Sequence, residues 1–141
     1  MENINALNEI SKGSSMGMDA ISFIIEKVDD EKLEKLLKDQ YVSYKKIQET
    51  IEEIYPKYDD GSPKTTNMKN KVMTDYMIEM KTIKDSSTSH LAEILIQGTN
   101  MGIIEGRRIL NKKKLNEEVY NLIAKYVSMQ EKYLSSLKDY L

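Results

Sequence analysis

The chain of 141 residues contains no cysteine, which excludes disulfide bonds, thiolate catalysis and metal or iron–sulfur sites with cysteine ligands. Its net charge is only −2, so no strong field favours binding to nucleic acid or to an anionic membrane. The most apolar stretches, 20–25 and 91–96, are far shorter than the ~20 residues that span a bilayer. No signal peptide is visible in residues 1–15. We therefore expect a cytoplasmic protein with no membrane span and no nucleic-acid partner.

Proline is also scarce, and both prolines, Pro56 and Pro63, flank the turn-forming stretch 59–62. Elsewhere apolar residues recur at steps of three and four, which is the period of amphipathic helices. Asp29 or Asp30 is expected to cap the second helix and Asn116 the fifth, and Pro56 is expected to end the second. The pattern predicts five helices, at about 3–28, 31–55, 68–84, 88–112 and from 117 to the last residues.

The sequence contains an internal repeat with a constant spacing of 85 residues. Gly-Ser-Ser-Met-Gly at 13–17 matches Gly-Thr-Asn-Met-Gly at 98–102, and Tyr-Val-Ser occurs at both 41–43 and 126–128. The alternative is coincidence between two amphipathic helix pairs, but glycine is a poor helix residue and its repetition favours duplication. We expect two duplicated helical hairpins, joined by a long crossover that carries a short helix, at 3–56, 88–141 and 57–87 respectively.

The repeated glycines call for a structural explanation, because each costs about 1 kcal/mol relative to alanine inside a helix. Glycines spaced by four residues make a flat strip on which a second helix can pack closely. The alternative is that the helices are locally weak and flexible at these points. We expect the first and fourth helices to cross with close backbone contact at Gly13, Gly17, Gly98 and Gly102.

These elements predict one all-α domain over 1–141, a four-helix bundle built from two hairpins with one long crossover, which is the ferritin-like arrangement. The glycine motifs, together with Val28-Asp29-Asp30-Glu31 and Leu36-Leu37, resemble bacterial ferritin-like proteins of unknown function in the rubrerythrin and bacterioferritin clan. Members of that clan that hold a di-iron centre supply a glutamate from each of two helices and a Glu-x-x-His motif from each of the other two.

The sequence departs from that metal-binding pattern, because it contains one histidine and no Glu-x-x-His motif. The apolar stripe of the second helix passes through Gln40 or Tyr41 and then Tyr44. The fifth helix carries Tyr126 and Met129 at its middle. Tyrosine and methionine at such positions are typical of an adaptable core. The resemblance therefore implies a ferritin-like protein without the di-iron ligands, and we expect no cofactor.

Two further features could carry chemistry. Glu9, Glu93 and Glu105 could face inward and hold a hard cation, or they could be ordinary solvent-facing carboxylates. The only histidine, His90, could act as a proton switch or a ligand, or it could be a surface residue at the start of the fourth helix.

Three functions follow from these features. The leading hypothesis is a non-catalytic structural or interaction protein that forms a homo-oligomer or binds a protein partner. The alternatives are a metal-binding protein or oxidoreductase with an atypical carboxylate site, and a small-molecule carrier that uses the core of the bundle. Because some ferritin-like relatives serve in spore coats, the resemblance also allows a spore-associated setting.

Overall fold

The computed structural model describes residues 2–65 and 71–141. Every regular element in these two ranges is helical, which confirms the predicted all-α class. The predicted helices are present, although the first ends at Ile25 and the third ends at Lys81, each three residues earlier than expected. Residues 68–70 of the predicted third helix lie outside the described residues. The helices are α1 (Glu2–Ile25), α2 (Glu31–Ile54), α3 (Lys71–Lys81), α4 (Thr88–Lys112) and α5 (Glu117–Leu137), with short 3-10 turns η1 (Tyr55–Lys57) and η2 (Lys138–Tyr140).

Side-chain caps account for where two of the long helices begin. The Asp30 carboxylate accepts a hydrogen bond from the backbone N–H of Leu33 at 2.9 Å, so Asp30 is the one of the two predicted residues that caps α2. The Ser87 hydroxyl accepts one from the backbone N–H of His90 at 3.3 Å and caps α4. Asn116 stands at the N-cap of α5, but its side chain makes no capping bond, contrary to the prediction.

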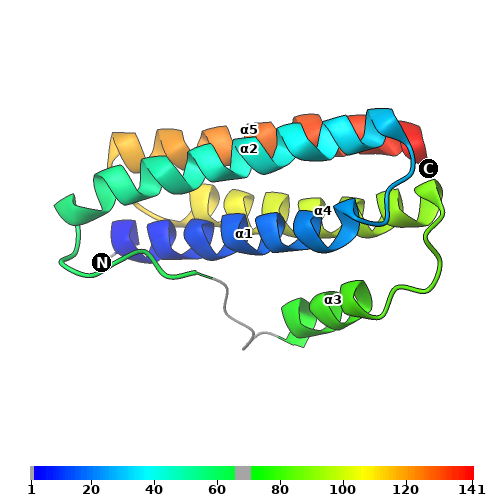
Figure 1. Cartoon of the computed structure of the whole chain (residues 1–141). Coiled ribbons are helices and arrows are strands. Elements are labelled where there is room, and N and C mark those ends of the chain that lie inside the picture. The colour runs from blue at the N-terminus through cyan, green and yellow to red at the C-terminus, as the bar shows by residue number, and fades with distance from the viewer. Residues whose placement is uncertain (1, 66–70) are drawn as a thin grey trace.

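The four long helices pack as two antiparallel hairpins, α1 with α2 and α4 with α5 (Figure 1). The hairpins meet through α1 against α4 and through α2 against α5. The helix α3 lies beside α1, outside the four long helices (Figure 1). The shared core consists of apolar side chains from all four long helices, and its fully buried members include Leu7, Ile10, Leu33, Leu37, Leu91, Ile94 and Ile123. None of the described helices is long and apolar enough to cross a membrane.

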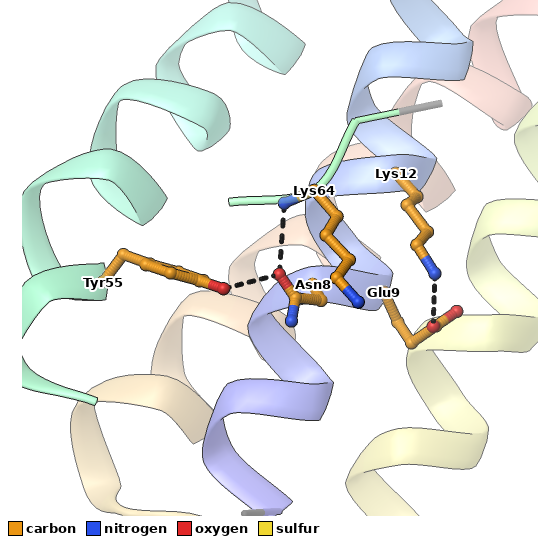
Figure 2. A network of polar contacts seen from close by, with 5 residues as sticks. All are labelled: Asn8, Glu9, Lys12, Tyr55 and Lys64. Carbon is orange, nitrogen blue, oxygen red and sulfur yellow. Dashed lines mark hydrogen bonds and ion pairs between the residues drawn. The ribbon is translucent and has the colours of Figure 1, made fainter. Parts of the chain in front are cut away.

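The connection between the hairpins is held at both of its described ends. At its start, the Asn8 side-chain oxygen on α1 accepts hydrogen bonds from the Tyr55 hydroxyl at 2.9 Å and from the Lys64 backbone N–H at 3.1 Å (Figure 2). At its end, the buried Tyr76 hydroxyl on α3 donates to the backbone carbonyl of Ile94 on α4 at 3.0 Å. The connection therefore places Tyr76 against the middle of the helical core.

Burial follows the predicted spacing of 85 residues in the first helix of each hairpin but not in the second. In α1 and α4, pairs at this spacing such as Ser14 and Thr99, or Ile24 and Ile109, are buried together. In α2 and α5, Tyr41 is 37% exposed, whereas its predicted equivalent Tyr126 is 1% exposed. The gapless register is therefore wrong for the second helices. There, burial follows a spacing of 86 residues, which pairs Leu33 with Val119, Leu37 with Ile123, Gln40 with Tyr126, Tyr44 with Gln130 and Ile51 with Leu137.

Candidate functional site: a cavity between the hairpins

A partly open cavity of about 440 Å³ lies between α1 and α4 and reaches the centre of the helical core. Its inner wall includes Gln40, Tyr44, Tyr126 and Gln130, which are all at most 3% exposed. Its charged lining residues come from one turn of α1 and one turn of α4, and they include the exposed Arg108. We call these charged residues the mouth of the cavity: Glu9, Lys12, Glu105 and Arg108.

Neighbouring charges at the mouth are of opposite sign. On α1, the Lys12 ammonium forms an ion pair with a Glu9 carboxylate oxygen (Figure 2), at a distance of 3.2 Å. Only 16% of the Lys12 side chain is exposed. On α4, Glu105 and Arg108 show the same spacing of three residues, with the acidic residue first. Two acidic and two basic residues leave the mouth without a strong preference for a charged ligand.

The repeated glycines make room for side chains around this cavity. A Cβ atom added at Gly17 would lie 2.5–2.9 Å from ring carbons of Tyr44 on α2. The helices α1 and α4 do pack against each other. However, the glycines do not provide the predicted close contact between backbones. The atoms nearest to a Cβ added at each of these glycines are side-chain atoms. These belong to Tyr126 at Gly13, Tyr44 at Gly17, Tyr76 at Gly98 and Gln130 at Gly102.

Two hydrogen bonds between helices organise the polar centre of the cavity. The Tyr44 hydroxyl on α2 donates to the side-chain oxygen of Gln130 on α5 at 2.9 Å. The side-chain amide nitrogen of Gln40 donates to the hydroxyl of Thr99 on α4 at 3.1 Å. The rings of Tyr44 and Tyr126 pack at a tilt of 56°, with 6.4 Å between their centroids. These bonds tie α2 to α4 and to α5 beside the cavity.

The phenols around the cavity are held in their neutral form. Burial raises the pKa of Tyr44 to about 12, and the nearby side chains of Gln40 and Thr99 oppose this increase only in part. Burial also raises the pKa values of Tyr76 and Tyr126, and the neighbouring Tyr44 adds to both shifts. At neutral pH the inner wall therefore offers hydrogen-bond donors and acceptors but no charge.

The three glutamates of the predicted carboxylate site are not brought together. Glu9 and Glu105 line the same cavity mouth, whereas Glu93 does not line the cavity and is 57% exposed. One Glu93 carboxylate oxygen lies 3.6 Å from a ring nitrogen of His90, which also lies away from the cavity. No group of three or more histidine, aspartate or glutamate residues in the described ranges is arranged to hold a metal ion.

The sequence pattern allowed either Gln40 or Tyr41 in the core, and it did not indicate Gln130. The structure selects Gln40 over Tyr41 for the core, and it places Gln130 rather than Met129 at the centre of α5. The missed signal is a glutamine on an otherwise apolar helical stripe, since Val119, Ile123, Tyr126, Gln130, Tyr133 and Leu137 follow steps of four and three.

Comparison of the chain with protein-family models, with curated proteins and with solved structures finds no match.

Proposed function

We propose that the protein binds a small, largely apolar molecule in the cavity between its two hairpins. The observation that supports this function is the cavity of about 440 Å³. This volume falls within the range of roughly 300–1,000 Å³ that is usual for ligand sites. An engineered cavity of about 150 Å³ already accommodates benzene. Apolar side chains such as Met16, Ala20 and Leu95 supply much of the wall, and uncharged polar side chains such as Gln40 and Thr99 supply part of the rest.

The chemistry of the wall favours binding over catalysis. Among the described residues that line the cavity, Thr99 carries the one aliphatic hydroxyl, and this hydroxyl accepts its hydrogen bond from an amide instead of donating one to a base. The tyrosines stay protonated at neutral pH, because burial raises their pKa values. The Glu105 carboxylate at the mouth adds to the increase in the pKa of Tyr126. This non-catalytic role develops the small-molecule carrier that the sequence left as an alternative.

The proposal is tested with N-phenyl-1-naphthylamine, a neutral dye whose fluorescence increases when it enters an apolar site. The wild-type protein is expected to bind the dye with a stoichiometry of one and to gain thermal stability from it. Ala20 is 4% exposed and lines the cavity, so Ala20→Phe is expected to fill part of the cavity and abolish dye binding. Ala124→Phe is the matched control, because Ala124 is half-buried on α5 and does not line the cavity. Undiminished binding to Ala20→Phe would refute this location.

We also propose that the fold is a four-helix bundle of the ferritin-like type, derived by duplication of one hairpin. Two antiparallel hairpins joined by a connection that carries α3 support this proposal. Paired burial at spacings of 85 and 86 residues supports it as well. In this view the cavity occupies the position of the lost metal ligands. Elemental analysis after growth with iron, manganese and zinc tests that view, and stoichiometric bound metal would contradict it.

Self-assembly and protein partners stay predictions, for which light scattering is the measurement.

A further inference from the structure

One side chain on the cavity wall comes from outside the four long helices. Among the described residues that line the cavity, Tyr76 of α3 is the one that does not belong to α1, α2, α4 or α5. Tyr76 is 5% exposed, and its hydroxyl donates to the backbone carbonyl of Ile94 on α4 at 3.0 Å. The helix of the crossover therefore supplies part of the wall through a side chain that is held in place.

The helix α3 is attached to both helices that border the cavity, α1 and α4. It packs against α1 (Figure 1), and its residues Met77 and Met80 are buried together with Tyr76. At the end of α3, the Lys81 ammonium lies 5.7 Å from the centre of the Phe23 ring on α1, which is a cation–π contact. Because α3 packs on α1 while its tyrosine bonds to α4, the Tyr76 side chain bridges these two helices beside the cavity.

Gly98 on α4 makes the room that the Tyr76 ring occupies. A Cβ added at Gly98 would overlap the Tyr76 hydroxyl oxygen, and it would lie 2.6 Å from Cζ and 3.1 Å from Cε2 of the ring. Gly98 lines the cavity as well. The phenol therefore fills space directly at the cavity wall, and a smaller side chain at position 76 would leave that space open to the cavity.

The two hairpins differ at this point of the wall. At the spacing of 85 residues, Gly98 corresponds to Gly13, where the nearest side chain is Tyr126 of α5. At the spacing of 86 residues, Tyr126 corresponds to Gln40 of α2, so the same packing would place Gln40 next to Gly98. The atoms nearest to a Cβ at Gly98 belong to Tyr76 instead. The crossover thus supplies a phenol where the second helix of the first hairpin has none.

We infer that α3 is part of the ligand site and that the Tyr76 side chain sets the upper limit on the size of the ligand. The aromatic ring is a rigid stop, because its planar shape cannot shorten and its hydroxyl is tied to Ile94. A ligand that extends beyond the ring would have to displace a close-packed side chain. This inference rests on the proposed ligand binding and names the residue that determines which ligands fit.

Two rigid hydrocarbons of different size, naphthalene and the larger pyrene, test this limit. The dissociation constant of naphthalene is measured by displacement of N-phenyl-1-naphthylamine, and that of pyrene by its own fluorescence. Each constant is compared between variant and wild type, so the hydration of the free probe cancels. We expect Tyr76→Ala to bind pyrene about tenfold more tightly than the wild type does, because burying roughly two further ring carbons strengthens binding by about that factor. Naphthalene should gain much less, because it does not extend to the ring.

Two further variants assign the effect to the ring of Tyr76. Tyr76→Phe removes the hydroxyl and its bond to Ile94 but keeps the ring, so it should give little of the gain for pyrene. Tyr55→Ala is the matched control, because Tyr55 is also a buried tyrosine of the connection and donates a hydrogen bond to Asn8 at 2.9 Å, but it does not line the cavity. It should leave both dissociation constants unchanged.

Hydrogen exchange on the wild-type protein tests the same inference without a substitution. With saturating N-phenyl-1-naphthylamine, the backbone amides of α3 should exchange several-fold more slowly, because a ligand that contacts this helix favours its docked state. Mass spectrometry of the peptide that contains Tyr76 measures the rate.

The outcomes distinguish this inference from the proposed function. If the wild-type protein binds the dye and naphthalene but Tyr76→Ala gains no more for pyrene than for naphthalene, the cavity binds ligands and Tyr76 does not limit their size. An equal gain for pyrene in Tyr76→Phe or Tyr55→Ala would also overturn the inference, since it would indicate general loosening. If the variants do not fold, slower exchange in α3 supports the inference, and slower exchange confined to the long helices overturns it. If neither the dye nor any probe binds to the wild type, the proposed function fails as well.

Discussion

Gly13→Ala tests directly why α1 has a glycine at the edge of the cavity. Alanine in place of glycine within a helix is intrinsically favourable by about 1 kcal/mol. At Gly13, however, the added Cβ would overlap the hydroxyl oxygen of Tyr126, which is a fully buried residue of α5. Overpacking of this kind typically costs about 1–3 kcal/mol. We therefore expect Gly13→Ala to lower the free energy of unfolding by up to about 2 kcal/mol.

Removing the hydroxyl should reverse the sign of this effect. In a Tyr126→Phe background the nearest remaining atom is the ring carbon Cζ, 3.4 Å from the added Cβ, which is an ordinary contact. Gly13→Ala should then raise the free energy of unfolding by about 1 kcal/mol, the helix-propensity gain alone. The double-mutant cycle should therefore give a coupling energy of about 1–3 kcal/mol. Urea denaturation of the four proteins measures it.

Gly17 provides the matched control for this cycle. A Cβ at Gly17 would lie 2.5–2.9 Å from three ring carbons of Tyr44, and these carbons remain in phenylalanine. Tyr44→Phe should therefore not rescue Gly17→Ala. If Gly13→Ala has the same effect with tyrosine and with phenylalanine at position 126, the glycine does not accommodate the hydroxyl and the reasoning is refuted.

Two further predictions concern the helix ends. Asp30→Ala should lower the free energy of unfolding by about 1 kcal/mol, because it removes a capping hydrogen bond. Asn116→Ala should lower it by less, because the Asn116 side chain makes no capping bond. Equal losses for the two variants in urea denaturation would contradict this difference. Hydrogen bonds from Tyr58 and Lys57 lower the pKa of Glu118, so its stabilising contribution is present above pH 4.5 and is lost as the pH falls through the folded-state pKa. The stability difference between wild type and Glu118→Gln should therefore shrink between pH 7 and pH 3, and a constant difference would argue against this linkage.

The helices themselves follow from local patterns in the chain. Apolar residues at steps of three and four predict an amphipathic helix, since this spacing places them on one face whatever the rest of the molecule does. Asp30 and Pro56 mark a helix start and a helix end for equally local reasons, a carboxylate that accepts a backbone N–H and a ring that cannot continue the helix. The all-α class and most helix bounds could therefore be predicted.

The composition of the cavity wall was decided by tertiary packing. Gln40 and Tyr41 are neighbours at the edge of one helical stripe, so periodicity allows either in the core. Contact of α2 with α4 selects Gln40, because the hydroxyl of Thr99 on α4 accepts a hydrogen bond from its amide. Gln130 could be recognised only with its partner, since glutamine is usually exposed and Tyr44 lies 86 residues away.

For the repeated glycines, too, the sequence shows one part of the explanation and the tertiary structure decides the other. Their positions and their cost to the helix are visible in the chain, which indicates that something must offset that cost. Two explanations, close backbones and large side chains, predict the same glycine spacing. Only the assembled structure distinguishes them, because the atoms that approach Gly13 and Gly17 belong to tyrosines on two other helices. Those tyrosines line the cavity between α1 and α4, and a cavity depends on distances between helices that no single segment of the sequence specifies.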